Sequence, residues 1–330
     1  MLALEGDLSV GTLIRLIDLK KYFPILSGFF HKTHVDLKAV DGVSFEIEEG
    51  DTFGLVGESG CGKTTIGKVL LKLYEPTSGE IFFNGKDVTH LQGIALEEYR
   101  KNIQAVFQNP YASLNPRMRI WRLIGEPLMA EGWSIGKVKE RVSELLDLVM
   151  LPIDCGSRFP HEMSAGQRQQ IAIARALSIN PKFIVLDEPT SLLDVSAQAS
   201  ILNMIVGLQK KLELTYLFIS HNLAVVRFLS NRVGVMYCGK LVELADSRRL
   251  YLAPKHPYSQ ALLASILTPD PELQSQEIVL EGDVISPINP PEGCRFYSRC
   301  QEVRECCKEK EPPLVEIEPN HLVACHLRSS

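Results

Sequence analysis

Residues 51–65 read DTFGLVGESGCGKTT, an apolar run followed by a glycine-rich turn. The run Thr52–Val56 has the length and composition of a buried strand. From Gly57 to Thr64 the residues follow the spacing G-x-x-x-x-G-K-[ST], in which a glycine-rich loop opens a helix whose first backbone N–H groups point at one anion. This stretch therefore predicts a strand, a phosphate-binding loop and a helix in succession.

The residue types in this loop suit a nucleotide. A Cβ would block the close approach of the backbone to phosphate, which accounts for the glycines. Lys63 supplies a positive charge that reaches the outer phosphates, and Thr64 offers a hydroxyl to Mg²⁺. The alternative is a strand-to-helix corner that binds nothing. It is disfavoured because a helical pattern of apolar residues continues after the loop as far as Leu73.

Composition narrows the classes of function. The chain has 330 residues, enough for about two domains, and 45% of them are apolar, enough for a sizeable core. The net charge is −5 with both signs mixed along the chain, so no basic face for duplex nucleic acid is predicted. No apolar run reaches membrane-spanning length, and the N-terminal residues lack the pattern of a signal peptide. We therefore expect a cytoplasmic protein that does not bind nucleic acid.

Polar side chains end three apolar runs. Asp187 and Glu188 follow FIVL, His221 follows LFIS, and Gln108 follows VF. Ligands of parallel α/β sheets bind at the carboxyl ends of the strands, so one carboxylate is placed to hold Mg²⁺ and the other to orient a water. The alternatives are surface charges and a solvated glutamine. For the two carboxylates, the phosphate loop upstream favours the ligand-binding interpretation.

A second helix start is visible in the sequence MSAGQRQQ. Ser164 and Gln167 have the spacing of a capping box, which predicts a well-capped helix that runs to about Ser178. The same helix start, with small residues and exposed backbone N–H groups, also suits a second anion. These residues leave both interpretations open.

Other runs outline the remaining elements. Asn84-Gly85 is a hairpin signal, and a polar insert extends to about Lys38. Ahead of that insert, Tyr22 and Phe23 suit either stacking on a nucleobase or filling the edge of a β layer. The predicted elements are strands at 13–16, 39–47, 52–56 and 80–83, helical sequence at 120–150 with Val138, Val142, Leu145, Leu146 and Val149 on one face, and a hairpin at 232–244 about Gly239-Lys240.

The motifs GESGCGKTT, VFQNP, MSAGQRQQ, FIVLDEPTSLLDVS and ISHN occur in the order and type seen in ATP-binding cassette (ABC) ATPases. KKYFPI, PYASLNPRM, HPYSQALLASI and the tail SPINPPEGCRFYSRC resemble more narrowly the second, F-type ATPase subunit of oligopeptide and dipeptide importers. The resemblance covers nearly the whole chain. It implies an α/β fold with a RecA-like core, an antiparallel β layer and a helical subdomain at about 109–163, within a nucleotide-binding domain at 1–254. An extension at 255–330 with a cysteine cluster is implied to follow.

The resemblance also implies roles for individual residues. Glu188 is implied to be the general base for the attacking water, His221 to contact the γ-phosphate, and Gln108 to sense Mg²⁺ and contact the membrane partner. Asp187 is implied to hold the metal through water. The residues implied to bind ATP and Mg²⁺ are Phe23 or Tyr22 at the adenine, and Gly57, Ser59, Gly60, Cys61, Gly62, Lys63, Thr64, Thr65, Gln108 and Asp187 at the phosphates and the metal.

In this family two ATPases close over ATP, and each nucleotide lies between the phosphate loop of one subunit and the signature helix of the other. Ser164, Gly166 and Gln167 are thereby implied to contact an ATP held by the opposite ATPase, which accounts for the second anion site. Asp194 is implied to lie in the loop that crosses the dimer interface. The implied partners are a second homologous ATPase in a heterodimer, two transmembrane permease subunits and, indirectly, a solute-binding protein.

The implied function is ATP hydrolysis that powers peptide-type import from the cytoplasmic face of the membrane. The alternative is a soluble ABC ATPase of DNA repair or translation. Those proteins carry a long coiled-coil insertion or two cassettes, and this chain shows neither. A P-loop kinase, the other alternative, would not need MSAGQ or SLLDVS.

Three positions depart from the family pattern. Ala165 replaces the first glycine of the usual LSGGQ and adds a methyl group beside the γ-phosphate of the partner's site. Asn222 stands where aspartate usually follows the histidine, and Leu192 where alanine is usual. None of the three removes a catalytic group, so we expect the site built on Lys63 and Glu188 to hydrolyse ATP.

Five of the eight cysteines lie near the C-terminus. A disulfide framework is not expected in a cytoplasmic chain, and the spacing does not match the knuckles of structural zinc. A proline-rich tail with few apolar residues cannot bury much core, so a metal link would supply its folding energy. The family's tail pattern matches at Cys294, Cys300, Cys307 and Cys325. It implies a 4Fe-4S cluster, ahead of zinc or free thiols, with Cys306 outside the pattern.

Overall fold

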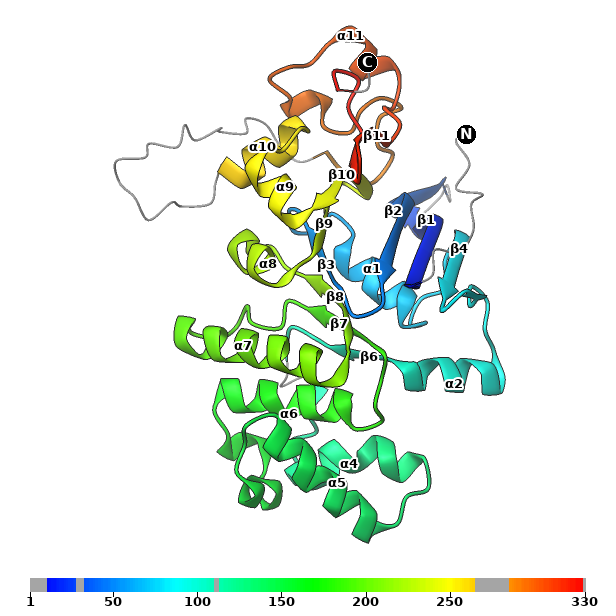
Figure 1. Cartoon of the computed structure of the whole chain (residues 1–330). Coiled ribbons are helices and arrows are strands. Elements are labelled where there is room, and N and C mark those ends of the chain that lie inside the picture. The colour runs from blue at the N-terminus through cyan, green and yellow to red at the C-terminus, as the bar shows by residue number, and fades with distance from the viewer. Residues whose placement is uncertain (1–10, 28–32, 110–112, 265–284, 329–330) are drawn as a thin grey trace, which may run out of the picture. The chain divides into compact units, whose positions relative to one another are not determined.

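A computed structural model describes residues 11–27, 33–109, 113–264 and 285–328 (Figure 1). The chain divides into two compact units. The first unit comprises Met1–Glu48, Thr52–His90 and Ile219–Ser330, and the second comprises Glu49–Asp51 and Leu91–Phe218. The first residues of the predicted helical subdomain, 110–112, and part of the C-terminal extension, 265–284, lie outside the described residues.

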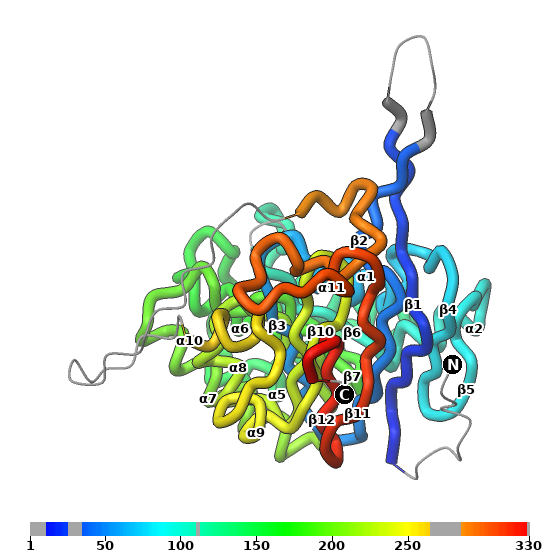
Figure 2. Tube along the Cα trace, turned by 90° about the horizontal axis from the view of Figure 1, so that it is seen from above, coloured from blue at the N-terminus to red at the C-terminus, as the bar shows by residue number. Residues whose placement is uncertain are grey.

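The first unit contains the predicted antiparallel β layer. Its strands are β1 (Thr12–Ser27), β2 (Thr33–Glu48), β4 (Ser78–Phe83) and β5 (Lys86–Asp87), in the order β2-β1-β4-β5. Figure 2 shows β1 and β2 side by side as a long ladder. The prediction of a polar insert up to Lys38 was wrong at both ends. Cross-strand pairs such as Phe23 with Leu37 and Ile25 with Val35 extend the pairing beyond the apolar runs.

The turn between β4 and β5 confirms the Asn84-Gly85 hairpin. Both residues have positive φ, 48° and 75°, which is the conformation that a two-residue type I′ turn requires. Asparagine and glycine tolerate this conformation best, so the dipeptide determines where the chain reverses.

A second sheet of the first unit carries the phosphate loop. β3 (Thr52–Val56) is buried along its whole length and pairs in parallel with β9 (Arg232–Tyr237). β9 continues into β10 (Lys240–Asp246), followed in the sheet by β12 (His321–Val323) and β11 (Val315–Glu318). The hairpin predicted at 232–244 is confirmed, but its turn is Cys238-Gly239, with φ of 45° and 83°, one residue earlier than predicted.

The helices of this unit are short. α1 (Lys63–Leu70) follows the phosphate loop, and it ends before Leu73, which is 54% exposed. The predicted helical pattern was therefore one turn too long, because Lys72 adopts a positive φ of 55° after the last helical residue. The remaining helical elements are α8 (Leu223–Leu229), α9 (Ser247–Leu252), α10 (Pro257–Ala264), η3 (Tyr297–Arg299) and α11 (Glu305–Glu309).

The C-terminal residues 285–328 pack into the first unit more closely than their composition predicts. Phe296 is 2% exposed and meets the rings of Tyr237 and Tyr258 at centroid distances of 5.2 and 5.4 Å. β12 pairs with the edge of β10, and Val323 is fully buried. The expectation that this tail cannot bury much core was wrong, because a few apolar side chains use a core and a sheet edge that other parts of the chain supply.

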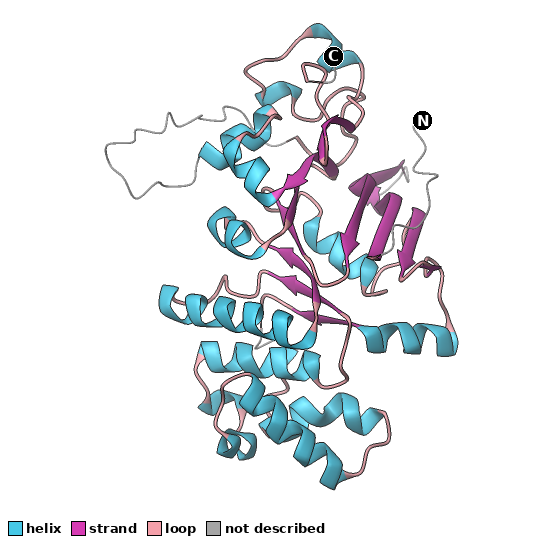
Figure 3. Cartoon of the chain, viewed as in Figure 1, coloured by secondary structure: helices cyan, strands magenta, loops and turns pink. Residues whose placement is uncertain are grey.

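The second unit combines three strands with several helices (Figure 3). β6 (Ile103–Val106) and β7 (Phe183–Asp187) are parallel, as predicted for FIVLD, and β8 (Thr215–Ile219) lies next to β7. The helices are α2 (Gly93–Asn102), α4 (Ile120–Ala130), α5 (Ile135–Leu148), α6 (Ala165–Leu177) and α7 (Val195–Leu212), with 3-10 turns η1 (Ile153–Ser157) and η2 (Pro160–Glu162).

The helical periodicity of 120–150 is confirmed. The five residues predicted to share one face are each at most 2% exposed: Val138, Val142, Leu145, Leu146 and Val149. Within the described parts of the chain, no helix is both long enough and apolar enough to cross a membrane.

Candidate nucleotide-binding site

The phosphate loop of the first unit has the backbone that its glycines permit. Gly57, Gly60 and Gly62 have φ of 147°, 81° and 109°. A Cβ on Gly57 would lie 2.2 Å from the carbonyl oxygen of Met236, and a Cβ on Gly62 would lie 2.2 Å from that of Ala39. These two glycines are therefore required both by conformation and by the strands that flank the loop.

The Lys63 side chain folds back onto the start of the phosphate loop. Its ammonium is buried and donates to the carbonyl oxygens of Gly57 and Glu58 over 2.7 and 3.0 Å. Burial raises the pKa of the neighbouring Cys61 thiol, which holds it in the uncharged form. The exposed residues of the loop are Ser59, Gly60 and Thr64, so an anion can approach the start of α1 from solvent.

Tyr22 and Phe23 lie on β1 in different surroundings. The Tyr22 hydroxyl donates to the carboxylate of Asp41, and the Lys38 ammonium lies 5.6 Å from the centre of its ring. Burial, followed by the bond to Asp41, raises the pKa of Tyr22. The Phe23 and Tyr74 rings pack in a T-shaped arrangement with their centres 5.3 Å apart.

His221 is exposed and lies between β8 and α8. The next residue, Asn222, is the N-cap of α8, and its side-chain oxygen accepts from the N–H groups of Ala224 and Val225 over 3.1 and 3.4 Å. Asparagine and aspartate serve equally well at an N-cap. The departure from aspartate at this position therefore preserves the local structure beside His221.

In the second unit, the residue after β7 contacts the segment that follows β6. The side-chain amide of Gln108 donates to the carboxylate of Glu188 over 2.8 Å. Asp187 is 7% exposed at the end of β7, whereas Glu188 is half-buried. Glu188 has φ of 49°, a left-handed conformation that costs a non-glycine residue energy and is concentrated at functional sites.

The start of α6 has the predicted capping box. Ser164 Oγ accepts from the N–H of Gln167 over 3.2 Å, and the Gln167 side chain accepts from the N–H of Ser164 over 3.0 Å. Asp194 is likewise an N-cap, of α7, and accepts from the N–H of Ala197 over 2.8 Å. This backbone bond, and next the hydroxyl of Ser196, lower the pKa of Asp194. This capping role was not predicted, although an aspartate directly before a helical pattern is a signal for it.

The surroundings of Glu58 were not predicted either. Its carboxylate pairs with Arg299, and its backbone N–H donates to the Tyr258 hydroxyl over 2.9 Å. Both partners lie about 200 residues or more away along the chain. Local sequence patterns carry no signal for such a contact.

Four of the C-terminal cysteines line one small cavity of about 10 Å³: Cys294, Cys300, Cys307 and Cys325. Cys306 is exposed and is not among the lining residues. Burial raises the pKa of Cys294 to about 12. Among the described residues, however, no group of three or more His, Cys, Asp or Glu side chains is arranged to hold a metal ion. The structure thus gathers the four predicted thiols around one cavity, but the described residues form no metal site.

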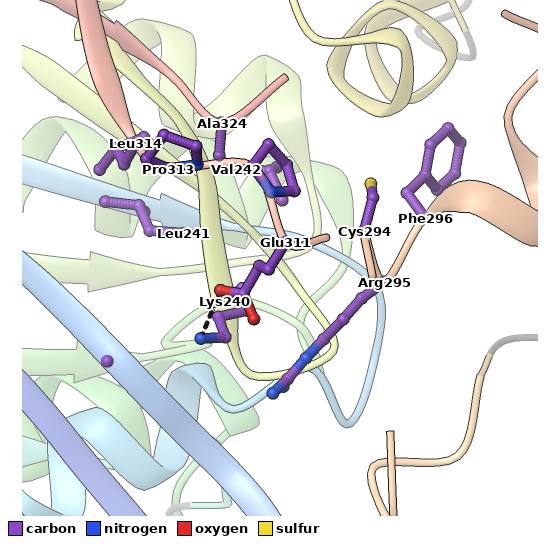
Figure 4. Close-up of a pocket in the computed structure, with 12 residues that line it drawn as sticks. Lys240, Leu241, Val242, Cys294, Arg295, Phe296, Glu311, Pro313, Leu314 and Ala324 are labelled. Carbon is purple, nitrogen blue, oxygen red and sulfur yellow. Dashed lines mark ion pairs between the residues drawn. The ribbon is translucent and has the colours of Figure 1, made fainter. Parts of the chain in front are cut away.

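A larger cavity of about 100 Å³ adjoins the same segment, between β10 and residues 311–314 (Figure 4). The Lys240 ammonium pairs with the carboxylate of Glu311 over 2.6 Å on its wall. Figure 4 shows Cys294 and Arg295 extending in opposite directions from the same stretch of chain. Arg295 points away from Cys294 and contacts Asp41 and the carbonyl of Cys238 in the turn after β9.

Two family models match the chain. Residues 40–191 match "ABC transporter", and residues 242–307 match "Oligopeptide/dipeptide transporter, C-terminal region". A relative from Bacillus subtilis (strain 168), the oligopeptide transport ATP-binding protein AppF, is 50% identical over 96% of this chain and 98% of its own length.

Solved structures agree on the fold. The structure of cbiO1 from Clostridium perfringens, part of the ABC transporter complex cbiONQ, is similar with a TM-score of 0.64 at 23% identity, over 74% of this chain and 92% of that one. The ATP-binding cassette MJ0796, a dimer in a post-hydrolysis state bound to ADP and Pi, is similar with a TM-score of 0.63 at 26% identity, over 72% of this chain and 99% of that one. The predicted P-loop ABC ATPase fold is therefore confirmed.

Proposed function

This chain belongs to the ATP-binding subunits of oligopeptide-type ABC importers, and we propose that its phosphate loop and its Gln108–Glu188 pair are two parts of one ATP-hydrolysing site. Hydrolysis of ATP by such a subunit powers the import of peptides. The observation that carries the proposal is the pairing of Gln108 with Glu188 at the end of a buried strand. This pairing holds a half-buried carboxylate in one orientation at the edge where α/β proteins bind ligands.

Each side chain has a chemical task in this proposal. Lys63 and the amides of the first turn of α1 bind the phosphates, as the loop geometry allows. Glu188 accepts a proton from the attacking water while Gln108 holds its carboxylate. Mg²⁺ would neutralise charge on the phosphates, and the hydroxyl of Thr64, the amide oxygen of Gln108 and the carboxylate of Asp187 are the hard oxygen donors that it prefers.

Three residues of the α6 start complete the proposal in a dimer. We assign Ser164, Gly166 and Gln167 to an ATP held by a second ATPase, and Asp194 to the interface between the two. Ser164 and Asp194 are exposed, and the capping box leaves the start of α6 well ordered. That MJ0796, 26% identical, is a dimer bound to ADP and Pi supports this arrangement.

The partners follow from the family. Peptide importers of this class need membrane permeases, and we propose two of them, together with a homologous but distinct second ATPase at the cytoplasmic face and a solute-binding protein that acts indirectly. For the aromatic contact with adenine we propose Tyr22 or Phe23. The Tyr22 hydroxyl is hydrogen-bonded to Asp41. Asp41 lies two residues after Ala39, whose carbonyl oxygen lies against Gly62 of the loop.

Two measurements test this function. Affinity purification of the full chain from its own cells should recover two polytopic membrane proteins and a second ATPase. The purified complex in vesicles should take up labelled oligopeptides only when ATP and Mg²⁺ are supplied on the side that bears the ATPases. Uptake without ATP, or purification of the chain with no membrane protein, would contradict the proposal.

The four gathered cysteines carry a second proposal, that they hold a thiolate-ligated metal group, with 4Fe-4S as the form that the tail pattern favours. The support is that all four predicted thiols line one cavity and that Cys306 does not. A cluster of this kind would crosslink residues 294–325 and stabilise their fold.

Iron and sulfide analysis with visible absorbance, on anaerobically purified full chain, tests this group. We expect Cys300→Ser to lose iron and absorbance and the matched variant Cys306→Ser to retain both. Colourless and metal-free protein that is fully folded would contradict it.

A further inference from the structure

Arg299 joins the C-terminal region to the phosphate loop. Its guanidinium forms three contacts of 2.9–3.1 Å with the two carboxylate oxygens of Glu58, the residue directly after Gly57. The Arg299 side chain is 7% exposed and that of Glu58 is 27% exposed. Two-pronged pairs of this kind fix geometry as well as charge.

The backbone of Glu58 is held on both sides as well. Its N–H donates to the hydroxyl of Tyr258 over 2.9 Å, and its carbonyl oxygen accepts from the Lys63 ammonium over 3.0 Å. Tyr258 is fully buried against the ring of Tyr237 at 4.7 Å. Glu58 is therefore a link between the C-terminal region and the lysine that we assign to the phosphates.

A second contact runs from the same segment to the other end of the loop. Arg295 donates to the carbonyl of Cys238 and pairs with Asp41. The next residue, Gly239, donates its N–H to the carbonyl of Cys61 in the loop over 2.9 Å. Residues 294–300 thus contact the loop in two ways. Arg299 pairs directly with Glu58, and Arg295 acts through the Cys238-Gly239 turn, which binds the carbonyl of Cys61.

The charge of Glu58 explains why a counter-ion matters here. A carboxylate at the start of a phosphate loop repels the polyphosphate that the loop is to bind. Paired with Arg299 in two-pronged contact, it presents no net charge and cannot turn toward the anion. The backbone of the loop does not supply this neutralisation, because its amides serve the phosphates.

We propose that Arg299 is a positioning residue for ATP, which neutralises and orients Glu58 and thereby makes the nucleotide affinity of this subunit depend on its C-terminal region. The proposal rests on the proposed ATP site. Because Arg299 directly precedes Cys300, and Cys294 directly precedes Arg295, any group that orders these thiols acts on the same two contacts.

Equilibrium binding of Mg·ATP to the purified full chain tests the proposal. Arg299→Gln leaves the carboxylate of Glu58 unpaired, and we expect the Kd for ATP to rise roughly tenfold at low salt. The difference should shrink as ionic strength rises from about 0.01 M to about 0.15 M. Arg299→Lys should give an intermediate Kd, since lysine restores the positive charge but cannot form the two-pronged contact with the carboxylate.

The double variant Glu58→Gln/Arg299→Gln separates charge from structure. It removes both charges, so we expect a Kd for ATP within about twofold of the wild type at low salt. In the assembled transporter, Arg299→Gln should raise the KM for ATP and leave kcat nearly unchanged. The matched control is Lys308→Gln, which removes an exposed lysine that pairs with Glu305 in the same region.

Wild-type affinity in Arg299→Gln would overturn the proposal, as would a double variant as weak as the single one. Should Arg299→Gln fail to fold, the double variant alone decides, because a tenfold loss of affinity in it would also overturn the charge argument. A wild-type chain that binds no ATP would instead contradict the proposed function.

Discussion

The side-chain amide of Gln108 donates to the carboxylate of Glu188 across 2.8 Å, and thereby connects the end of β6 to the end of β7. The two strands are parallel neighbours, so their carboxyl ends meet at one edge. This contact holds the carboxylate of Glu188 at the edge of the sheet where α/β proteins bind ligands.

Replacing Glu188 with glutamine should preserve the contact with Gln108 and remove the base. We expect ATP to bind with unchanged affinity while the rate of hydrolysis falls by at least about 100-fold. Phosphate release by the reconstituted transporter measures this, with Glu97→Gln, an exposed carboxylate on α2, as the control. Unchanged ATPase and transport rates in the Glu188 variant would contradict its role.

Replacing Gln108 with glutamate should move the pH dependence of hydrolysis. Two carboxylates at this distance cannot both ionise easily, so the pKa of the pair rises and the base is protonated at neutral pH. We expect the acid limb of the profile of kcat against pH to shift upward, with activity partly recovered in alkaline buffer. Gln92→Glu adds the same charge at an exposed position, and its profile should match the wild type.

Gly166 and Ser164 offer a test that separates folding from ATP contact. A Cβ on Gly166 would meet only the Cβ of Ala197, at an ordinary 3.5 Å, and alanine favours a helix over glycine. Gly166→Ala should therefore keep or raise the free energy of unfolding, by up to about 1 kcal/mol, and still weaken ATP-driven association with the partner ATPase.

Ser164→Ala should instead lower the free energy of unfolding by about 1 kcal/mol, because it removes the N-cap of α6. Thermal unfolding and ATP-dependent light scattering distinguish the two variants. Normal association in Gly166→Ala would argue against a contact of this helix start with ATP.

Lys72 provides a pH test of stability. It is 5% exposed, and burial lowers its pKa from 10.5 to about 8. Between those values the unfolded chain binds more protons than the folded chain, so the free energy of unfolding rises with pH. Lys72→Met has no such pH dependence. Relative to the wild type, its free energy of unfolding should be highest below about pH 8 and should fall by up to about 3 kcal/mol by pH 10.5.

Chemical unfolding of both proteins across this pH range measures the difference. Lys86→Met, at an exposed lysine of β5, should show a constant offset from the wild type. The same constant offset in Lys72→Met would show that burial does not shift this lysine.

Several elements could be predicted because local patterns decide them. The phosphate loop, the buried strand before it, the Asn84-Gly85 turn and the capping box at Ser164 depend on residues only a few positions apart. The family and the order of its motifs also follow from the sequence, as the 50% identity to a Bacillus subtilis relative confirms. The end of α1 was misjudged because an apolar residue continues the period beyond the point where the backbone leaves the helix.

The stretch that predicts nucleotide binding is thus determined by the sequence alone, because its glycines, lysine and threonine are adjacent and their spacing imposes the loop. What holds that loop was decided only by the tertiary structure. Arg299 lies 241 residues from Glu58 and Tyr258 lies 200 residues from it, and no local pattern relates them. They meet because Phe296 and Tyr258 pack on Tyr237 of the strand next to β3, and burial of apolar rings brings together charges that the chain order keeps apart.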